Sequence, residues 1–214
     1  MDNKEILSHV DHTLLKATST WEQIRKICEE AQRNHTAAIC IPPAYVKQAR
    51  ENFPELKIAT VIGFPLGYNT TAVKVFETKE AIREGADEID MVINIGWAKD
   101  GLFDKITDEI RQLKEACGDL ILKVIVETCY LSEEEKKAVC RCVTDAGADY
   151  IKTSTGFGTA GATIEDVKLF KEYIGPNVRI KAAGGIRTKE DMEAFLEEGV
   201  DRIGCSAAVS VLGE

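Results

Sequence analysis

No apolar run in the sequence approaches the roughly 20 residues that a membrane-spanning helix needs. The first residues, MDNKEILSHV, do not combine a basic stretch with a following apolar one, so we expect no secretory signal and a cytoplasmic protein. Basic residues are also in deficit, because 27 Lys and Arg stand against 36 Asp and Glu, for a formal net charge of -9. Since a phosphate backbone binds to a basic face, nucleic acid is not an expected partner, whereas a locally positive pocket could still hold a small anion.

Paired cysteines and clusters of metal ligands are missing as well. The seven cysteines are scattered and contain no CxxC motif, which is typical of reduced thiols rather than of a disulfide framework. His9 and His12 lie three residues apart, but the sequence offers no third ligand near them. We therefore predict that the chain holds no metal.

The composition that remains is that of an ordinary globular protein of 214 residues, 44% hydrophobic and 29% charged. A chain of this length buries about 70% of its unfolded surface, which suits one domain over residues 1–214. Short apolar runs alternate with longer amphipathic stretches. The predicted strands are residues 10–13, 37–41, 57–62, 88–93, 120–127, 150–153, 179–182 and 202–205. The predicted helices are residues 21–34, 71–84, 103–116, 132–146, 163–173 and 189–198.

This alternation of strands and helices indicates a parallel β/α architecture. Strands buried on both faces should read as nearly continuous apolar runs, and several of these do. Two arrangements compete, a closed (β/α)8 barrel and an open doubly wound sheet. The count of eight strands favours the closed (β/α)8 TIM barrel.

An internal repeat indicates which side chains point into that barrel. The segments GADEID (85–90), GADYIK (147–152) and GVDRIG (199–204) each place a glycine at the end of a predicted helix and an isoleucine inside the next strand. Because side chains alternate along a strand, the three isoleucines share the face under the helices. The residues that follow them, Asp90, Lys152 and Gly204, then point into the barrel.

Three charged residues inside apolar strands are candidates for chemistry: Asp90, Lys152 and Lys181. Burial and a neighbouring cation both lower the pKa of an amine, and a lysine must be neutral to attack a carbonyl and form a Schiff base. Asp90 would supply a carboxylate for proton transfer. The competing interpretation is a structural ion-pair network that fills the barrel, to which Lys123 and Glu127 could also belong.

The loops after the seventh and eighth predicted strands have the character of a phosphate site. Barrels often bind phosphate there, because glycines let backbone amides approach the oxygens. A serine hydroxyl and an arginine can add donors. The predicted substrate-binding residues are Gly184, Gly185 and Arg187 of the first loop, Gly204 and Ser206 of the second, and Thr155 and Gly156 beside the candidate nucleophile.

These segments resemble the deoxyribose-phosphate aldolases, a family of class I aldolases. The similarity extends from DHTLL (11–15) to GCS (204–206), and its most specific parts are EIDMVIN (88–94), KTSTGF (152–157) and KAAGGIR (181–187). The resemblance implies a (β/α)8 fold and reversible cleavage of 2-deoxy-D-ribose 5-phosphate to D-glyceraldehyde 3-phosphate and acetaldehyde, in deoxyribonucleoside catabolism. It also implies that no metal or organic cofactor is used and that the protein is a homodimer.

For individual residues, the resemblance implies that Lys152 forms the Schiff base, that Lys181 perturbs this amine and that Asp90 and Lys181 transfer protons. It also places Asp11 among the substrate-binding residues. Ala207 stands where family members often have a second serine, so we expect phosphate binding to depend more on backbone amides. Some members carry a C-terminal tyrosine tail that this sequence, which ends at VLGE, does not show, so water or another group would protonate the enamine carbon.

Two other functions remain open on the residues alone. One is a different phosphate-binding barrel enzyme, such as a sugar-phosphate isomerase, which needs a general base but no imine. The other is a non-catalytic sensor of sugar phosphates, which would bind its ligand without turnover.

Overall fold

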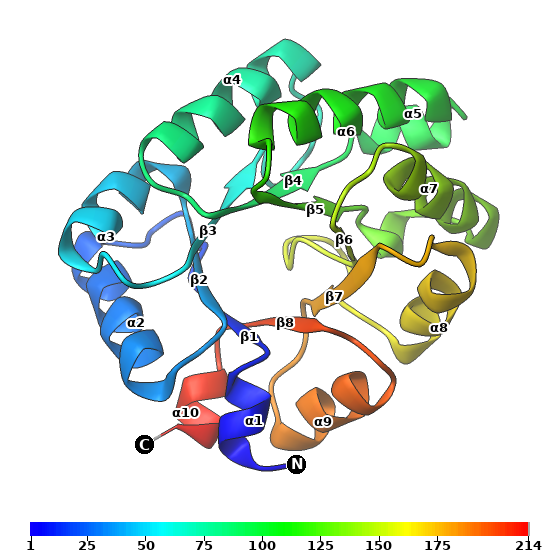
Figure 1. Ribbon diagram of the computed structural model, residues 1–214. Coiled ribbons are helices and arrows are strands. Elements are labelled where there is room, and N and C mark those ends of the chain that lie inside the picture. The colour runs from blue at the N-terminus through cyan, green and yellow to red at the C-terminus, as the bar shows by residue number, and fades with distance from the viewer. Residues whose placement is uncertain (214) are drawn as a thin grey trace.

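The computed structural model describes residues 1–213 and shows a closed barrel of eight parallel strands (Figure 1). Each strand pairs with its neighbours in chain order, and β1 closes the ring against β8. The strands are β1 (Val10–Thr13), β2 (Ala38–Ile41), β3 (Ile58–Ile62), β4 (Glu88–Val92), β5 (Ile121–Ile125), β6 (Tyr150–Lys152), β7 (Arg179–Ala183) and β8 (Arg202–Cys205). The predicted TIM barrel is thus confirmed.

Helices form the outer ring of the barrel (Figure 1). The longer ones are α2 (Trp21–Asn34), α4 (Thr71–Arg83), α6 (Phe103–Cys117), α7 (Glu133–Asp145), α8 (Ile164–Tyr173) and α9 (Lys189–Glu197). Shorter ones, which the sequence analysis missed, are α1 (Asn3–Leu7), α3 (Val46–Asn52), α5 (Ile95–Lys99), α10 (Ala208–Leu212), η1 (Pro43–Tyr45) and η2 (Thr128–Tyr130). At seven residues or fewer, their amphipathic period is too brief to stand out.

The repeat divides the side chains as predicted. The isoleucines Ile89, Ile151 and Ile203 are fully buried in the core between strands and helices. On the opposite face of the strands, the barrel interior has an apolar part formed by Cys40, Ala59 and Val61 and a charged part formed by other strands.

The aspartate of each repeat segment forms a hydrogen bond to the neighbouring strand. Asp87, Asp149 and Asp201 each accept a hydrogen bond from an amide at the start of the preceding neighbour strand, at 2.8, 2.8 and 2.9 Å. The glycines two residues earlier all have positive φ, between 74° and 111°, which glycine adopts at little cost. The repeat therefore has a structural role, because it fixes the start of each strand relative to its neighbour.

Four of the six longer helices, α2, α7, α8 and α9, begin at a side-chain cap. Ser132 forms a capping box with Glu135 at the start of α7. At α2 the cap is Thr20, which forms a capping box with Gln23.

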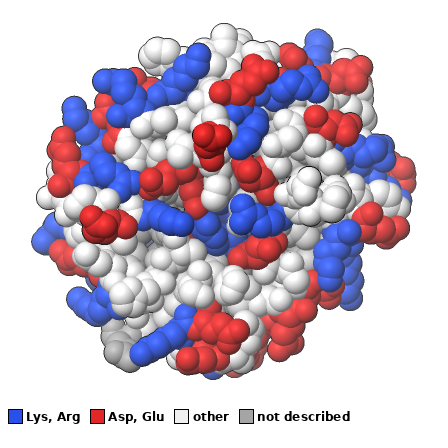
Figure 2. All heavy atoms as spheres, in the orientation of Figure 1, with Lys and Arg blue, Asp and Glu red and all other residues white. Residues whose placement is uncertain are grey.

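The molecular surface mixes charges of both signs. On the face shown in Figure 2, acidic and basic side chains interleave around the ring of helices and do not gather into one basic patch. Within residues 1–213, no helix combines the length and the apolar character that crossing a membrane would require. All seven cysteines are free thiols.

Candidate active site

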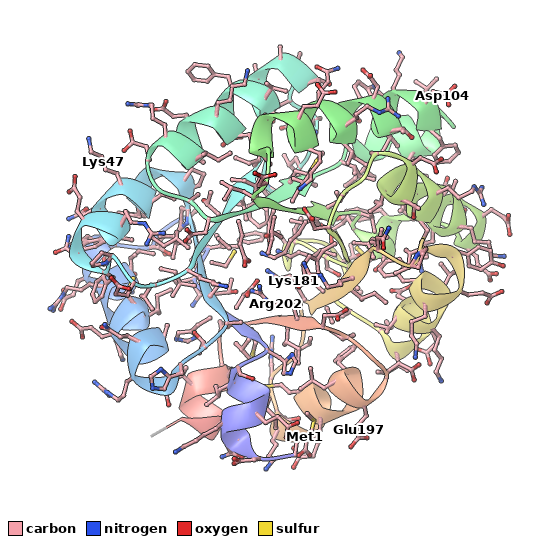
Figure 3. The ribbon with its side chains drawn as sticks, in the orientation of Figure 1. Met1, Lys47, Asp104, Lys181, Glu197 and Arg202 are labelled. Atoms are coloured by element: carbon pink, nitrogen blue, oxygen red, sulfur yellow. The ribbon has the colours of Figure 1, made fainter. Side chains whose placement is uncertain are left out.

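Charged side chains from six of the eight strands meet inside the barrel. We call this set the interior ion network; its members are Asp11 (β1), Glu88 and Asp90 (β4), Lys123 (β5), Lys152 (β6), Lys181 (β7) and Arg202 (β8). None is more than 8% exposed. Figure 3 shows Lys181 and Arg202 directed toward the barrel centre, whereas Lys47 and Asp104 lie on the outer ring.

Asp90 is the common partner of the three lysines. Its Oδ2 accepts hydrogen bonds from Lys152 Nζ at 2.7 Å and Lys181 Nζ at 2.8 Å, and its Oδ1 accepts one from Lys123 Nζ at 2.9 Å. Strand register explains the convergence, because Asp90 is level with Lys123 on β5, and Lys152 is level with Lys181 on β7. The two amines that the sequence singled out therefore lie side by side on one carboxylate oxygen.

A second group of ion pairs lies nearer the amino ends of the strands. Arg202 and Glu88 are the first residues of β8 and β4, and the guanidinium contacts this carboxylate at 2.8 Å. Asp11 accepts hydrogen bonds from both Arg202 and Lys181. Lys123 Nζ lies 2.5 Å from Glu88 and 3.5 Å from Asp11. The network thus runs without interruption from the amino end of the barrel to Lys152.

Electrostatics separates Lys152 from the other two lysines. Burial of the ammonium form lowers the pKa of Lys152, and the charge of Lys181 lowers it further, against the opposing effect of Asp90. Burial acts in the same direction on Lys181, but Asp11 and Asp90 outweigh it and raise the pKa of Lys181. Lys181 thus departs from the expectation that a neighbouring cation lowers the pKa of an amine, because Asp11 is a second carboxylate partner that the sequence pattern did not reveal.

The carboxylate of Asp90 stays ionised. Burial alone would raise the pKa of Asp90, but the charges of Lys123, Lys152 and Lys181 outweigh burial and hold it well below its usual value. The pKa of Asp11 is lowered by the same balance, with Lys181 as its strongest cationic partner. Both carboxylates are thus negative charges, which favour the protonated form of Lys123 and Lys181.

A cavity of about 410 Å³ opens over Lys152 at the carboxyl ends of the strands. Of the three predicted catalytic residues, only Lys152 lines it, and Lys152 is 3% exposed. Asp90 and Lys181 are fully buried next to this amine. Lys152 is thus the member of the interior ion network that reaches the cavity, and Asp90 and Lys181 lie directly behind it.

The two predicted phosphate loops form one wall of this cavity. Gly184, Gly185, Arg187, Gly204 and Ser206 all line it. Gly184 and Gly185 have φ of 84° and 79°, a backbone conformation that lets successive amides turn toward one point. A Cβ atom on Gly204 would lie 3.3 Å from Lys181 Cε, so the absence of a side chain there makes room for that lysine.

Residues on the other walls were only partly foreseen. Thr155 and Gly156 line the cavity as predicted, but the Thr155 hydroxyl already donates a hydrogen bond to Glu127. Glu127 was expected in the barrel interior, whereas β5 ends at Ile125 and Glu127 adopts a left-handed conformation with φ 55°. Its buried carboxylate also accepts the Thr155 amide at 3.1 Å. Glu127 therefore holds the loop that follows Lys152.

Asp11 does not occupy its predicted place. It is fully buried in the interior ion network and is not among the residues that line the cavity. Site residues that were not predicted from the sequence are Glu88, Arg202 and the cavity residue Lys16. The signals that could have found them are simple, because Glu88 and Arg202 share the inward face with Asp90 and Gly204, and Lys16 follows the first strand.

The two histidines that lie three residues apart face different partners. His12 Nε2 pairs with Glu30 at 2.8 Å, and His9 Nδ1 contacts the Asp201 carbonyl at 2.9 Å. Among residues 1–213, no three His, Cys, Asp or Glu side chains are arranged to hold a metal ion.

Comparison with known proteins gives consistent results. The model of the DeoC/LacD aldolase family matches residues 5–210. The deoxyribose-phosphate aldolase of Clostridium botulinum strain Alaska E43 is 61% identical over 213 residues, which are 99% of this chain and 96% of the relative.

Two solved structures are similar throughout. An aldolase designated QR15 superimposes with a TM-score of 0.94 at 38% identity, covering 97% of this chain and 94% of its own. The deoxyribose-phosphate aldolase of Aeropyrum pernix, described as tetrameric, superimposes with a TM-score of 0.88 at 29% identity, covering 99% and 91%.

Proposed function

This chain belongs to the DeoC/LacD family of aldolases, and from that premise we propose that Lys152, Lys181 and Asp90 carry its cleavage of 2-deoxy-D-ribose 5-phosphate. One observation supports the assignment above all. Lys152 is the member of the interior ion network that meets the cavity, and its pKa is lowered while that of Lys181 is raised. The enzyme is an aldehyde-lyase with a catabolic role in deoxyribonucleoside breakdown.

In the proposed mechanism, neutral Lys152 Nζ attacks the C1 aldehyde of the open-chain sugar. Loss of water from the carbinolamine gives an iminium ion, which acts as an electron sink. The C2–C3 bond then breaks, its electron pair forms an enamine over C1 and C2, and the C3 hydroxyl proton leaves through water to the Asp90–Lys181 pair. Glyceraldehyde 3-phosphate departs. Protonation of C2 and addition of water release acetaldehyde and regenerate the amine.

We assign the phosphate of the substrate to the wall formed by the Gly184–Gly185 turn and the Gly204–Ser206 segment. Amides at these glycines, the Ser206 hydroxyl and the Arg187 guanidinium are the donors that this wall offers to an anion. Binding there would orient C1 toward Lys152, which is an advantage of proximity.

Reduction with borohydride in the presence of acetaldehyde, followed by intact mass and peptide mapping, tests the assignment. We expect one adduct, on Lys152, and none in Lys152→Ala. A sugar-phosphate isomerase or a sensor would give no reducible adduct, and an adduct that persists in Lys152→Ala would refute the role of Lys152.

We also propose that the chain forms a homodimer. On α4, Val73 and Phe76 are 48% and 70% exposed, and they border a groove of about 570 Å³ that Pro43 and Ala44 also line. Exposed apolar side chains of this size are typical of contact surfaces between subunits. Light scattering should give twice the chain mass, and Phe76→Glu should lower it. A monomeric or tetrameric mass would contradict the proposal.

A further inference from the structure

The charges of the interior ion network are unequal in number. It contains three carboxylates, Asp11, Glu88 and Asp90, and four basic groups: Lys123, Lys152, Lys181 and Arg202. All seven are at most 8% exposed. An unmatched buried charge is costly, and a buried group avoids that cost by changing its protonation state. Three cations match the three carboxylates, so one basic group of the four is under pressure to be neutral.

The contacts identify which group that is. Lys123 contacts three carboxylates, and Lys181 and Arg202 contact two each. Lys152 contacts only Asp90, at 2.7 Å. Lys152 therefore loses the least when it gives up its proton, and as a neutral amine it still donates a hydrogen bond to Asp90.

Groups on the remaining walls do not alter this count. Strands β2 and β3 face the interior with Cys40, whose pKa is raised by burial so that the thiol stays neutral, and with apolar Ala59 and Val61. The Tyr150 ring of β6 lies under the Arg202 guanidinium, with 6.0 Å from Cζ to the ring centroid.

Two further basic residues, Lys16 and Arg187, line the cavity. They lie beyond the carboxyl ends of the strands and are not part of the interior ion network. The nearby buried carboxylate of Glu127 bonds to Thr155, and within residues 1–213 it forms no ion pair with the network. No fourth carboxylate therefore matches the fourth base.

We propose that Lys123, which does not line the cavity, is a positioning residue for the reaction, because as the third fixed cation it leaves Lys152 as the amine that must be neutral. Without Lys123, only Lys181 and Arg202 would face three carboxylates, and Lys152 would become the third cation. This inference rests on the proposed role of Lys152 as the nucleophile. The raised pKa of Lys123, on which Asp90, Asp11 and Glu88 outweigh burial, agrees with it.

The experiment compares the pH dependence of kcat/KM in four variants and the wild type. The acidic limb of each profile, where kcat/KM rises with pH, reports the pKa of Lys152. Lys123→Met should move the acidic limb of the profile to higher pH by about one unit or more, with activity recovered in alkaline solution. Glu88→Gln should move the limb to lower pH. The double variant Lys123→Met/Glu88→Gln leaves two cations and two carboxylates, so its limb should return toward that of the wild type.

The matched control is Lys74→Met. Lys74 is a fully buried lysine that pairs with Glu109 at 2.7 Å between α4 and α6, outside the barrel interior. We expect this variant to lose thermal stability with no shift of the limb. A structural role for Lys123 would make it behave like the control, and it would make the double variant worse than either single one.

The outcomes separate this inference from the proposed function. If the borohydride adduct maps to Lys152 but the limb of Lys123→Met stays in place, or the double variant does not restore it, the role of Lys123 is refuted and that of Lys152 stands. If Lys123→Met does not fold, two results decide the question: the limb of Glu88→Gln should move to lower pH, and that of the double variant should return toward the wild type. If the adduct maps to another lysine, the proposed function itself fails.

Discussion

Replacing Lys181 by Met should raise the pKa of Lys152 and slow the reaction near neutral pH. Both amines contact Asp90 Oδ2, at 2.8 and 2.7 Å, so their nitrogens lie within about 5.5 Å of each other. At an effective dielectric constant of about 20, two unit charges about 5 Å apart repel by about 3 kcal/mol, which corresponds to about two pKa units.

The direction of the effect follows from the form that reacts. Only neutral Lys152 attacks the aldehyde, so kcat/KM rises with pH through the pKa of this residue. Lys181→Met moves that limb to higher pH by about two units, and at a pH below both limbs kcat/KM falls by about 100-fold. Part of the loss should return as the pH is raised, which loss of proton transfer alone would not produce.

The measurement is kcat/KM from pH 5 to 10, with the release of acetaldehyde as the signal. Thermal unfolding accompanies it, because removing one partner of a buried ion pair costs about 3–5 kcal/mol. Lys74→Met serves as the control for a lost buried lysine. A limb that stays where it is in Lys181→Met would refute the electrostatic coupling between the two amines.

Three further outcomes follow from the site. A Cβ atom on Gly161 would lie 2.1 Å from the Gly184 carbonyl oxygen. Gly161→Ala should therefore displace the predicted phosphate wall and raise KM about tenfold or more, with a smaller change in kcat. An unchanged KM would show that this wall does not bind the phosphate. Glu127→Ala should loosen the loop after Lys152 and raise KM, whereas Glu127→Gln, which keeps an acceptor, should retain most of the activity. Equal losses of activity in the two variants would contradict the role of Glu127 in holding this loop. The buried aspartates have lowered pKa values, so they stabilise the fold above the ordinary carboxyl range near pH 4, and this contribution is lost as the pH falls through their folded values; chemical denaturation should show unfolding free energy declining below about pH 4, and a flat profile there would argue against it.

The interior of the barrel shows where sequence patterns suffice and where they fail. The alternation of strand residues placed Asp90, Lys152 and Lys181 on the inward face, and the structure confirms it. The same rule misplaced Glu127, because the apolar run continued past Ile125 while the chain had already left the strand. Periodicity gives the direction of a side chain only as far as the strand continues.

The ion pairs are the part of the site that no local pattern reveals. Asp11 is 170 positions from Lys181 in the chain, and Glu88 is 114 from Arg202. Each pair meets because the closed ring places β1 beside β8, one strand away from β7, and places β4 across the barrel from β8. Charge balance depends on all of these contacts together, so the protonation of Lys152 is a property of the closed barrel.

Local sequence patterns were enough to predict the order of strands and helices, the inward position of Lys152 and Lys181 and the glycines of the proposed phosphate loops. These follow from local alternation, capping and backbone freedom, which act over a few residues. Which carboxylate each cation contacts, and therefore which lysine can be neutral, depends on the folded barrel. The physical reason is that electrostatic energy in a buried interior depends on distances across the barrel, and those distances exist only once β1 has closed against β8.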